Sequence, residues 1–397
     1  MKIYNLLLLY LLTCWGASAQ PDSYTAFKTE TDWAATGFYY EIPFEYKQNA
    51  IIIKADIGGT LYDFILDTGA GLVISDEIAR ENNLSVVSQR TIAGANNLRQ
   101  KVKVVKIDSL KIGKLTFRDY DADAMDYIDS GLTECTVGNG GIIGYKIMQN
   151  AAWQINYKKG TISIADGVVG MPNLSKAVRL PLEIKNSIPF VDIKINGKKE
   201  RVVFDLGYFG SLLLNKKGFK RYKNLHYVTI EGSYSEGISG RKKDTFKIYK
   251  ADTVNLGTAS YTNKAFAVSD QIVFSLLGNK LIKDFIVTID YKGSSIYLTP
   301  YVDASLDKGY TDFDITLSYD DNKFIIETII ENSESEKMGL NTGDEVVAIN
   351  GKPIECHNTC DCQDYFFNLL HNSEELKITV LKEGMPKEYT LKKNKIF

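Results

Sequence analysis

The chain of 397 residues has few histidines and cysteines and no excess of positive charge. It contains three histidines and five cysteines, and its formal net charge is −2. Without a basic run or a basic stripe interleaved with aromatics, the sequence argues against nucleic acid as a partner. A serine or cysteine hydrolase is also disfavoured, because no nucleophile pattern accompanies the scattered histidines His226, His357 and His371.

A hydrophobic run long enough to cross a membrane is also missing after the N-terminus. The first 19 residues, MKIYNLLLLYLLTCWGASA, carry Lys2, an apolar stretch and the small residues 17–19. This is the layout of a cleaved export signal, which is too short for a stable anchor. We therefore expect residues 1–19 to be a signal peptide and residues 20–44 an N-terminal extension. The mature protein is expected to be periplasmic or secreted.

Lipid attachment at Cys14 is the alternative for this segment. Thr13 stands where lipoprotein signals usually carry Gly, Ala or Ser, so a lipid anchor to the cell envelope ranks second. Membrane association is expected only if Cys14 is lipidated.

Four cysteines remain after the signal, and export permits them to form disulfides. Cys356, Cys360 and Cys362 lie close together with His357 between them, and the fourth is Cys135. The C-x3-C-x-C spacing lacks the two separated pairs of a structural zinc site. Disulfides or free thiols are therefore favoured over a metal site, and we expect neither a metal nor an organic cofactor.

Strand patterns dominate the chain up to residue 300, where apolar residues alternate between clusters of Gly, Asn and Asp. A loop-like stretch over 165–176 separates two segments of similar size, which we place at 45–170 and 177–300. Residues 301–397 combine strands with helical spacing over Cys360–Asn372 and predict a separate small β/α module. The expected fold class is therefore mainly β.

The two segments repeat one spacing of glycines and acids. In GTLYDFILD and GKKERVVFD, a glycine precedes the final acid by eight positions, and these acids are Asp67 and Asp205. Later in each segment, an apolar pair precedes a glycine, at Gly144 and at Gly278. The repeat indicates a duplicated all-β unit.

An acid at the end of a buried apolar strand is costly unless it is paired or used in chemistry. If the segments pack with the pseudo-twofold symmetry that duplication permits, Asp67 and Asp205 meet at the axis. Two carboxylates that share a site cannot easily both ionise, so one keeps a proton. The ionised acid can then deprotonate a water as it attacks a peptide carbonyl, while the protonated acid donates to the developing oxyanion.

The stretch FILDTGAG around Asp67, followed by IIG at Gly144, resembles the retropepsin-like aspartic protease family. Two such units in one chain are similar to the pepsin-like or tandem retropepsin-like arrangement of secreted bacterial proteins. The resemblance covers about residues 45–300 and implies two β lobes that form a bilobal unit. It also implies that Asp67 and Asp205 are the catalytic residues and that the protein cleaves peptide bonds.

The same resemblance assigns supporting roles to the neighbours of the acids. Thr68 is expected to form hydrogen bonds that lock the two active-site loops, and Gly69 and Gly207 let the backbone fold closely around each acid. The family closes over its substrate with β-hairpin flaps. Ala93–Asn97 and Glu231–Gly240 are the candidates here, with ordinary hairpin turns as the alternative.

Leu206 departs from the family pattern. The second triplet is Asp205-Leu206-Gly207, so an apolar side chain replaces a hydroxyl that should help to fix the acids. Losing such a buried hydrogen bond costs about 1 to 3 kcal/mol if its partner stays unsatisfied. An active protease with a less rigid site and an inactive descendant both fit this departure.

The tail resembles a PDZ domain of the kind attached to exported bacterial proteases, through EKMGLNTGDEVVAINGKPI at Glu336–Ile354. PDZ domains bind extended peptides, often C-terminal ones, by strand addition. The stretch GYTDFDITL lacks a clear glycine-rich loop for a terminal carboxylate, so an internal peptide or a purely structural docking role stays open.

We therefore expect an exported aspartic endopeptidase, acting as a monomer on peptide or protein substrates, with a PDZ domain over 301–397 that binds a peptide ligand. One alternative is a catalytically inactive scaffold that only binds peptide. Another is a structural assembly factor in which the PDZ contacts dominate.

Overall fold

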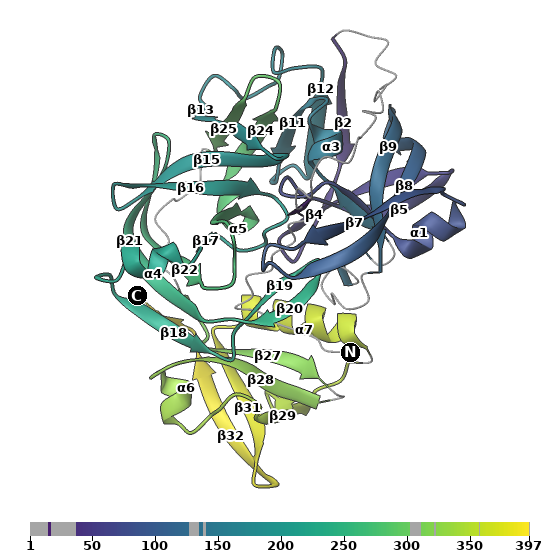
Figure 1. Ribbon diagram of the computed structural model, residues 1–397. Helices are drawn as coiled ribbons and strands as arrows, with labels where there is room; N and C mark the ends of the chain where they lie inside the picture. The colour runs from purple at the N-terminus through teal and green to yellow at the C-terminus, as the bar shows by residue number, and fades with distance from the viewer. Residues whose placement is uncertain are drawn as a thin grey trace.

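The computed structural model describes residues 15–16, 37–126, 135–137, 140–301, 311–320, 323–356 and 358–396. Within them the chain is mainly β, which confirms that part of the expected fold class. Figure 1 shows three parts, which we name the first half (37–165), the second half (178–300) and the C-terminal module (311–396). The predicted export signal lies outside the described residues except for Trp15 and Gly16.

The first half is built on a nine-stranded sheet with the order β1-β7-β8-β9-β6-β10-β5-β4-β3. Its strands are β1 (Trp15–Gly16), β3 (Glu45–Lys47), β4 (Ala50–Ile57), β5 (Thr60–Leu66), β6 (Leu72–Ser75), β7 (Val86–Ala93), β8 (Arg99–Ile112), β9 (Leu115–Met125) and β10 (Gly141–Ile143). Two short helices, α1 (Asp76–Glu81) and α3 (Tyr145–Met148), follow β6 and β10. Ser75 caps α1 by accepting a hydrogen bond from the Ile78 N–H, which satisfies one of its free backbone donors.

The second half repeats this arrangement. Its elements are β14 (Glu183–Lys185), β15 (Ile188–Ile195), β16 (Lys198–Asp205), β17 (Leu212–Leu214), α4 (Lys217–Arg221), β18 (Tyr227–Glu231), β19 (Tyr234–Gly237), β20 (Gly240–Lys243), β21 (Phe246–Leu256), β22 (Ala259–Ser269), β23 (Leu276–Gly278) and α5 (Asn279–Ile282). β16 pairs in parallel with β23 as β5 does with β10, and β17 pairs in parallel with β22 as β6 does with β9. The strand order around the two acids is therefore the same in both halves.

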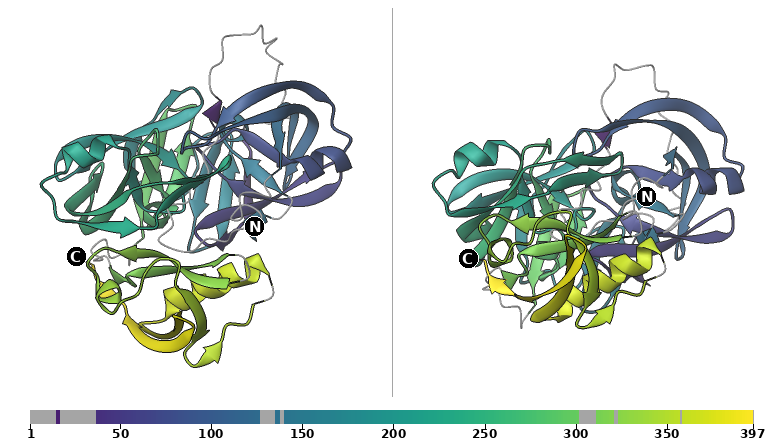
Figure 2. Two further views of the ribbon diagram at one scale, coloured as in Figure 1. Left: turned by 60° about the horizontal axis from the view of Figure 1, so that its bottom comes forward. Right: turned by 90° about the horizontal axis from the view of Figure 1, so that it is seen from below.

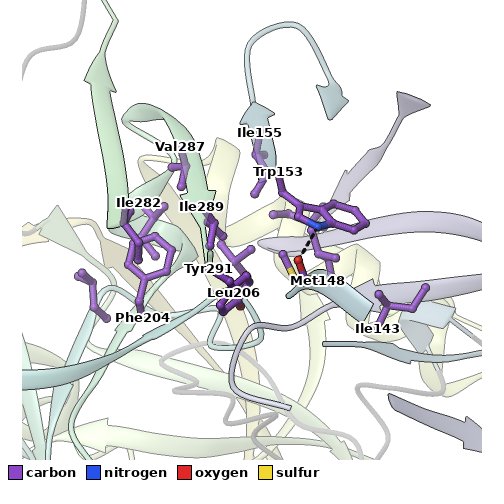
Figure 3. Packing of buried hydrophobic residues seen from close by; sticks show 14 of the residues in the cluster. Ile143, Met148, Trp153, Ile155, Phe204, Leu206, Ile282, Val287, Ile289 and Tyr291 are labelled. Carbon is purple, nitrogen blue, oxygen red and sulfur yellow. Dashed lines mark hydrogen bonds between the residues drawn. The ribbon is translucent and has the colours of Figure 1, made fainter. Parts of the chain in front are cut away.

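A six-stranded sheet joins the two halves, although the sequence assigns its strands to separate units. Its order is β13-β25-β24-β11-β12-β2. The strands are β2 (Tyr39–Pro43), β11 (Ala152–Asn156), β12 (Thr161–Ala165), β13 (Val178–Pro181), β24 (Phe285–Asp290) and β25 (Ser295–Pro300). β11 and β24 pair across the junction, and Ile155 and Ile289 are fully buried there (Figure 3). β2 belongs to this sheet, so the predicted extension 20–44 ends in a structural strand.

The C-terminal module has a hydrophobic core of its own, which includes Leu317, Ile326 and Phe366. Its elements are β26 (Thr311–Asp312), β27 (Ile315–Asp320), β28 (Lys323–Ile330), α6 (Glu334–Lys337), β29 (Glu345–Ile349), β30 (Lys352–Pro353), α7 (Thr359–Asn372), β31 (Glu375–Lys382), β32 (Met385–Lys392) and β33 (Asn394–Lys395). The helical spacing of Cys360–Asn372 corresponds to α7. Asn358 caps this helix by accepting hydrogen bonds from the N–H groups of Cys360 and Asp361.

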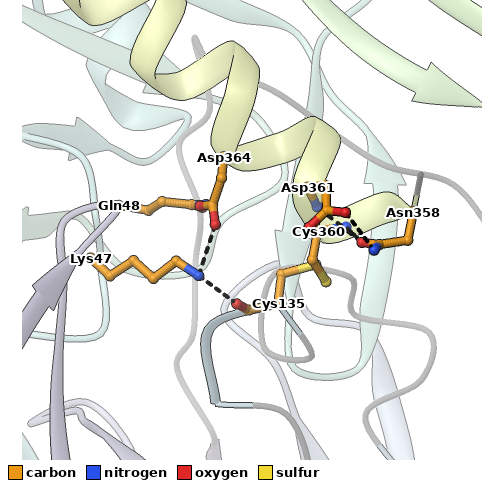
Figure 4. A network of polar contacts seen from close by, with 7 residues as sticks. All are labelled: Lys47, Gln48, Cys135, Asn358, Cys360, Asp361 and Asp364. Atoms are coloured by element: carbon orange, nitrogen blue, oxygen red, sulfur yellow. Dashed lines mark hydrogen bonds and ion pairs between the residues drawn. A yellow bond between two sulfur atoms is a disulfide. The ribbon is translucent and has the colours of Figure 1, made fainter. Parts of the chain in front are cut away.

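The module is attached to both halves (Figures 1 and 2). β28 pairs with β18 and so continues the sheet of the second half. On the other side, a disulfide joins Cys135 to Cys360 at the start of α7, and Lys47 Nζ lies 3.0 Å from Asp364 Oδ2 (Figure 4). These contacts fix α7 against the first half.

All four cysteines beyond the predicted signal are in disulfides, since Cys356 pairs with Cys362. Across the described ranges, no group of three or more His, Cys, Asp or Glu side chains could hold a metal ion. None of the described helices is long and apolar enough to cross a membrane.

Replacing Cys135 and Cys360 by serine is expected to destabilise the protein more than replacing Cys356 and Cys362. The first disulfide closes a separation of 225 residues and the second a separation of 6. Chain-entropy estimates give about 5 and about 2 kcal/mol respectively. Urea unfolding of the two double-serine variants measures both losses. Equal losses would contradict a tethering role for the Cys135–Cys360 bond.

Candidate active site

Two aspartates stand at corresponding strand ends of the two halves. Asp67 directly follows β5 and Asp205 is the last residue of β16, and both side chains are completely buried. The Gly69 N–H donates to Asp67 Oδ1 over 2.7 Å, and the Gly207 N–H donates to Asp205 Oδ1 over 2.9 Å. Matching strand pairs therefore give the two acids the same backbone environment.

The structure brings the two acids together at the junction of the halves. A Cβ atom built on Gly207 would lie 2.2 Å from Asp67 Cγ, so the loop that carries Asp205 runs directly against the carboxyl of Asp67. A side chain at this position would displace that carboxyl. The close approach explains why a glycine is needed after Leu206.

Thr68 connects the two loops. Its Oγ1 donates a hydrogen bond to the Phe204 carbonyl over 2.6 Å and accepts one from the Leu206 N–H over 3.0 Å. Leu206 has no hydroxyl to return these bonds and is instead fully buried in the hydrophobic cluster that also contains Tyr291 (Figure 3). Of the hydroxyl lock expected between the two loops, the half supplied by Thr68 is therefore present, and the half expected at position 206 is missing.

The two late glycines lie directly against the loops that carry the acids. A Cβ atom on Gly144 would lie 2.2 Å from the Ala70 carbonyl oxygen, and one on Gly278 would lie 2.2 Å from the Tyr208 carbonyl oxygen. Any other residue would push these loops apart. The repeated apolar-apolar-Gly pattern is thus a packing requirement of each loop.

Burial raises the pKa of both carboxyl groups. For Asp67, loss of hydration is the largest cause and repulsion from Asp205 the second, and its pKa lies well above the usual range. Loss of hydration also raises the pKa of Asp205 to about 7, although contact with Asp67 and backbone hydrogen bonds oppose the rise. Within the described residues, Asp67 Oδ2 and Asp205 Oδ2 are buried without a hydrogen-bond partner. At neutral pH the pair therefore retains a proton.

Two hairpins meet next to these acids. Asn96, at the tip between β7 and β8, donates from Nδ2 to the Gly240 carbonyl over 3.0 Å in the hairpin of β19 and β20. Ile238, at the tip of that second hairpin, packs in one apolar cluster with Ala70 and Phe209, which follow the two acids closely in the sequence. The second hairpin runs from β19 to β20 and extends three residues beyond the predicted segment 231–240. The tip of the second hairpin therefore packs against the segments that follow the two acids.

A family model described as Aspartyl protease matches residues 53–147. The match supports a retropepsin-like aspartyl protease. It includes Asp67 and Gly144 and ends before Asp205, so it concerns the first half of the site. No curated protein matches the chain.

Three buried side chains in the loops and hairpins around this aspartyl-protease-like site were not predicted from the sequence. Asn279 directly follows Gly278 and contacts the Leu206 carbonyl, Asn96 joins the two hairpins, and Glu236 is buried in the second hairpin. The repeat gives a signal only for Asn279, because the corresponding position of the first half is Tyr145. Asn96 and Glu236 lie in turn-forming sequence without a distinguishing pattern.

The variant Asp205→Asn is expected to stabilise the protein at pH 7 and to have little effect at pH 4. A carboxyl whose pKa is raised by folding adds stability below its unfolded pKa near 4. That stability is lost as the pH rises through its folded pKa of about 7. The gain at pH 7 should reach a few kcal/mol at most, since one pKa unit corresponds to about 1.4 kcal/mol.

Chemical denaturation at the two pH values measures this difference. Asp108→Asn, which changes an exposed carboxylate on β8, is the matched control. An Asp205→Asn variant that is destabilised equally at both pH values would show that the carboxyl is not held in its protonated form by burial.

Proposed function

We propose that the protein is an exported aspartic endopeptidase that holds an extended peptide between its two halves. The observation that carries this proposal is the pair of buried aspartates at corresponding strand ends, in contact with each other's loops. The match of residues 53–147 to the aspartyl protease model supports the same chemistry.

In this proposal Asp67 and Asp205 share one proton. The ionised carboxyl takes a proton from a water molecule as that water attacks the peptide carbonyl, and the protonated carboxyl donates to the carbonyl oxygen. Raised pKa values keep the shared proton in place over a wide pH range. The unpaired Oδ2 atoms are acceptors that a water could bridge.

The two hairpins are proposed to act as flaps. Their tips are joined by the Asn96 hydrogen bonds, and Ile238 packs in one apolar cluster with Ala70 and Phe209. Substrate entry between the halves would require the tips to separate. A lid that excludes water strengthens the electrostatic effects of the site during reaction.

The C-terminal module is proposed to be a PDZ domain that binds a peptide beside its helix α7. Among the described residues β27 pairs with β28 on one side only, and α7 packs next to it. This is the arrangement in which a peptide can add as a further strand. Export is supported by the two disulfides, which persist in oxidising compartments.

A peptide-binding scaffold without catalysis is the second candidate. Leu206 favours it, because the hydroxyl lock is made by Thr68 alone. The same covered site would then bind peptide without cleaving it.

Digestion of a denatured-protein peptide mixture from acidic to neutral pH tests the enzyme. We expect the wild type to cleave, and Asp67→Asn and Asp205→Asn each to lower the rate by at least about 1,000-fold, because either change removes the shared proton chemistry. Peptide mass spectrometry measures the products. Cleavage that persists in both variants would refute the dyad, whereas a wild type that binds peptides without cleaving them would favour the scaffold.

The second hairpin is also tied to the C-terminal module. Arg241 on β20 forms a largely buried ion pair with Glu327 on β28, and the Arg241 side chain also lies over the Tyr234 ring. Burial raises the pKa of Glu236 to about 7, and Arg241 opposes this rise. The cation therefore offsets two buried acids at the point where the hairpin meets the module.

Arg241→Ala is expected to lower the free energy of unfolding by roughly 3 to 5 kcal/mol, because removing one partner leaves the other buried charge uncompensated. Amide exchange over β19 and β20 should become faster. Urea unfolding and hydrogen exchange measure the two effects. Lys54→Ala, which breaks an exposed pair with Asp63, is the control and should cost less than about 1 kcal/mol. Unchanged exchange in Arg241→Ala would contradict a link between the hairpin and the module.

A further inference from the structure

The loop that carries Asp205 lacks one half of its side-chain support. Thr68 holds this loop through the Phe204 carbonyl and the Leu206 N–H. Leu206 offers no hydroxyl in return. If a rigid dyad is needed for catalysis, another group must hold the second loop in place.

Asn279 contacts this loop from another element, the start of α5. Its side chain is fully buried, and its Nδ2 donates to the Leu206 carbonyl and, over 3.0 Å, to the Asn49 carbonyl of the first half. Its Oδ1 accepts a hydrogen bond from the Tyr157 hydroxyl over 2.7 Å. Both amide hydrogens and the amide oxygen are thus used, and one side chain joins the Asp205 loop to two segments of the first half.

The residue after the late glycine makes the same backbone hydrogen bond in both halves, so the two halves differ at this position in the side chain alone. The Asn279 N–H donates to the Tyr208 carbonyl over 2.8 Å, as the Tyr145 N–H donates to the Ala70 carbonyl over 2.9 Å. The half that contains Thr68 carries a tyrosine at this position. The half that contains Leu206 carries the asparagine.

The tyrosine that orients Asn279 also has a counterpart. Tyr157 lies thirteen residues after Gly144, and Tyr291 lies thirteen residues after Gly278. Each reaches the residue that follows the late glycine of the opposite half: Tyr157 hydrogen-bonds to Asn279, and the Tyr291 ring packs edge-on against the Tyr145 ring with centroids 5.3 Å apart. The Tyr157–Asn279 contact is a hydrogen bond, whereas the Tyr291–Tyr145 contact is between rings. Because Asn279 also donates to the Leu206 carbonyl, its amide connects Tyr157 to the active-site loop.

We infer that Asn279, oriented by Tyr157, replaces the missing half of the hydroxyl lock and positions Asp205 for catalysis. This inference rests on the proposed peptidase function. Asn279 acts on Asp205 through the backbone of its loop, at the Leu206 carbonyl, so it is a positioning residue. It explains how a chain with Asp-Leu-Gly in its second triplet can keep a rigid dyad.

The test is Asn279→Leu, which keeps the approximate size of the side chain and removes its hydrogen bonds. We expect kcat to fall by roughly 10- to 100-fold, the effect of a small misplacement of a reacting group, with KM changed less than about threefold because the peptide-binding surface is untouched. The basic limb of the pH profile should move to lower pH, because water that enters the loosened loop relieves the burial that raises the dyad pKa. Tyr157→Phe should shift both readouts in the same direction by less, because it removes only the hydrogen bond that orients the amide.

A rescue experiment separates positioning from general stability. Leu206→Thr supplies the missing hydroxyl, so we expect it to restore a measurable part of the lost kcat in the Asn279→Leu background. An Asn279→Leu variant with normal kcat and pH profile overturns the inference, and so does a double variant that recovers nothing. If Asn279→Leu does not fold, Tyr157→Phe with and without Leu206→Thr provides the same comparison.

A wild type without peptidase activity would refute the proposed function. Support of the Asp205 loop by Asn279 is then tested by stability measurements that do not depend on activity. Melting temperatures of the wild type, Asn279→Leu, Leu206→Thr and the double variant give a double-mutant cycle, which compares the change in the double variant with the sum of the two single changes. If the hydroxyl and the amide support the same loop, the double variant melts higher than the sum of the single losses predicts. Additive losses would contradict that shared role.

Discussion

The structure depends on holding two carboxyl groups out of water and against each other. Burial opposes ionisation of each acid and their mutual repulsion opposes ionisation of both, so the arrangement persists only if the surrounding backbone supplies donors and rigidity. Gly69 and Gly207 donate to the acids, and the absence of a side chain on Gly207 permits the close approach of the two loops. The strand ends, the glycines and the contacts between the two loops together keep the two carboxyl groups buried and in place.

The two halves meet this constraint in different ways. On one side the Thr68 hydroxyl bridges two backbone groups of the other loop, and on the other side a buried amide from Asn279 reaches the Leu206 carbonyl. Two loops that hold one pair of acids need to preserve only the geometry of the pair, and the side chains that support each loop can differ. A hydrogen bond that one loop does not make can be supplied by a neighbouring element, provided that every buried polar group keeps a partner.

The C-terminal module contacts both halves rather than extending away from them. β28 pairs with β18 on one side, and the Cys135–Cys360 bond joins α7 to the first half on the other (Figure 4). The second hairpin meets the same module through Arg241. The module and the hairpin are therefore physically connected through this ion pair.

The sequence by itself determined the β character, the repeated spacing that ends in Asp67 and Asp205, and the glycines around them, because each follows from local periodicity and backbone freedom. Tertiary structure alone decided which elements meet. Four cysteines allow three pairings, β11 and β24 join segments that the sequence separates, and Thr68 contacts Leu206 across 138 positions. Such contacts depend on long-range packing, so a local pattern around Asn279 could not reveal that its amide reaches the second acid's loop.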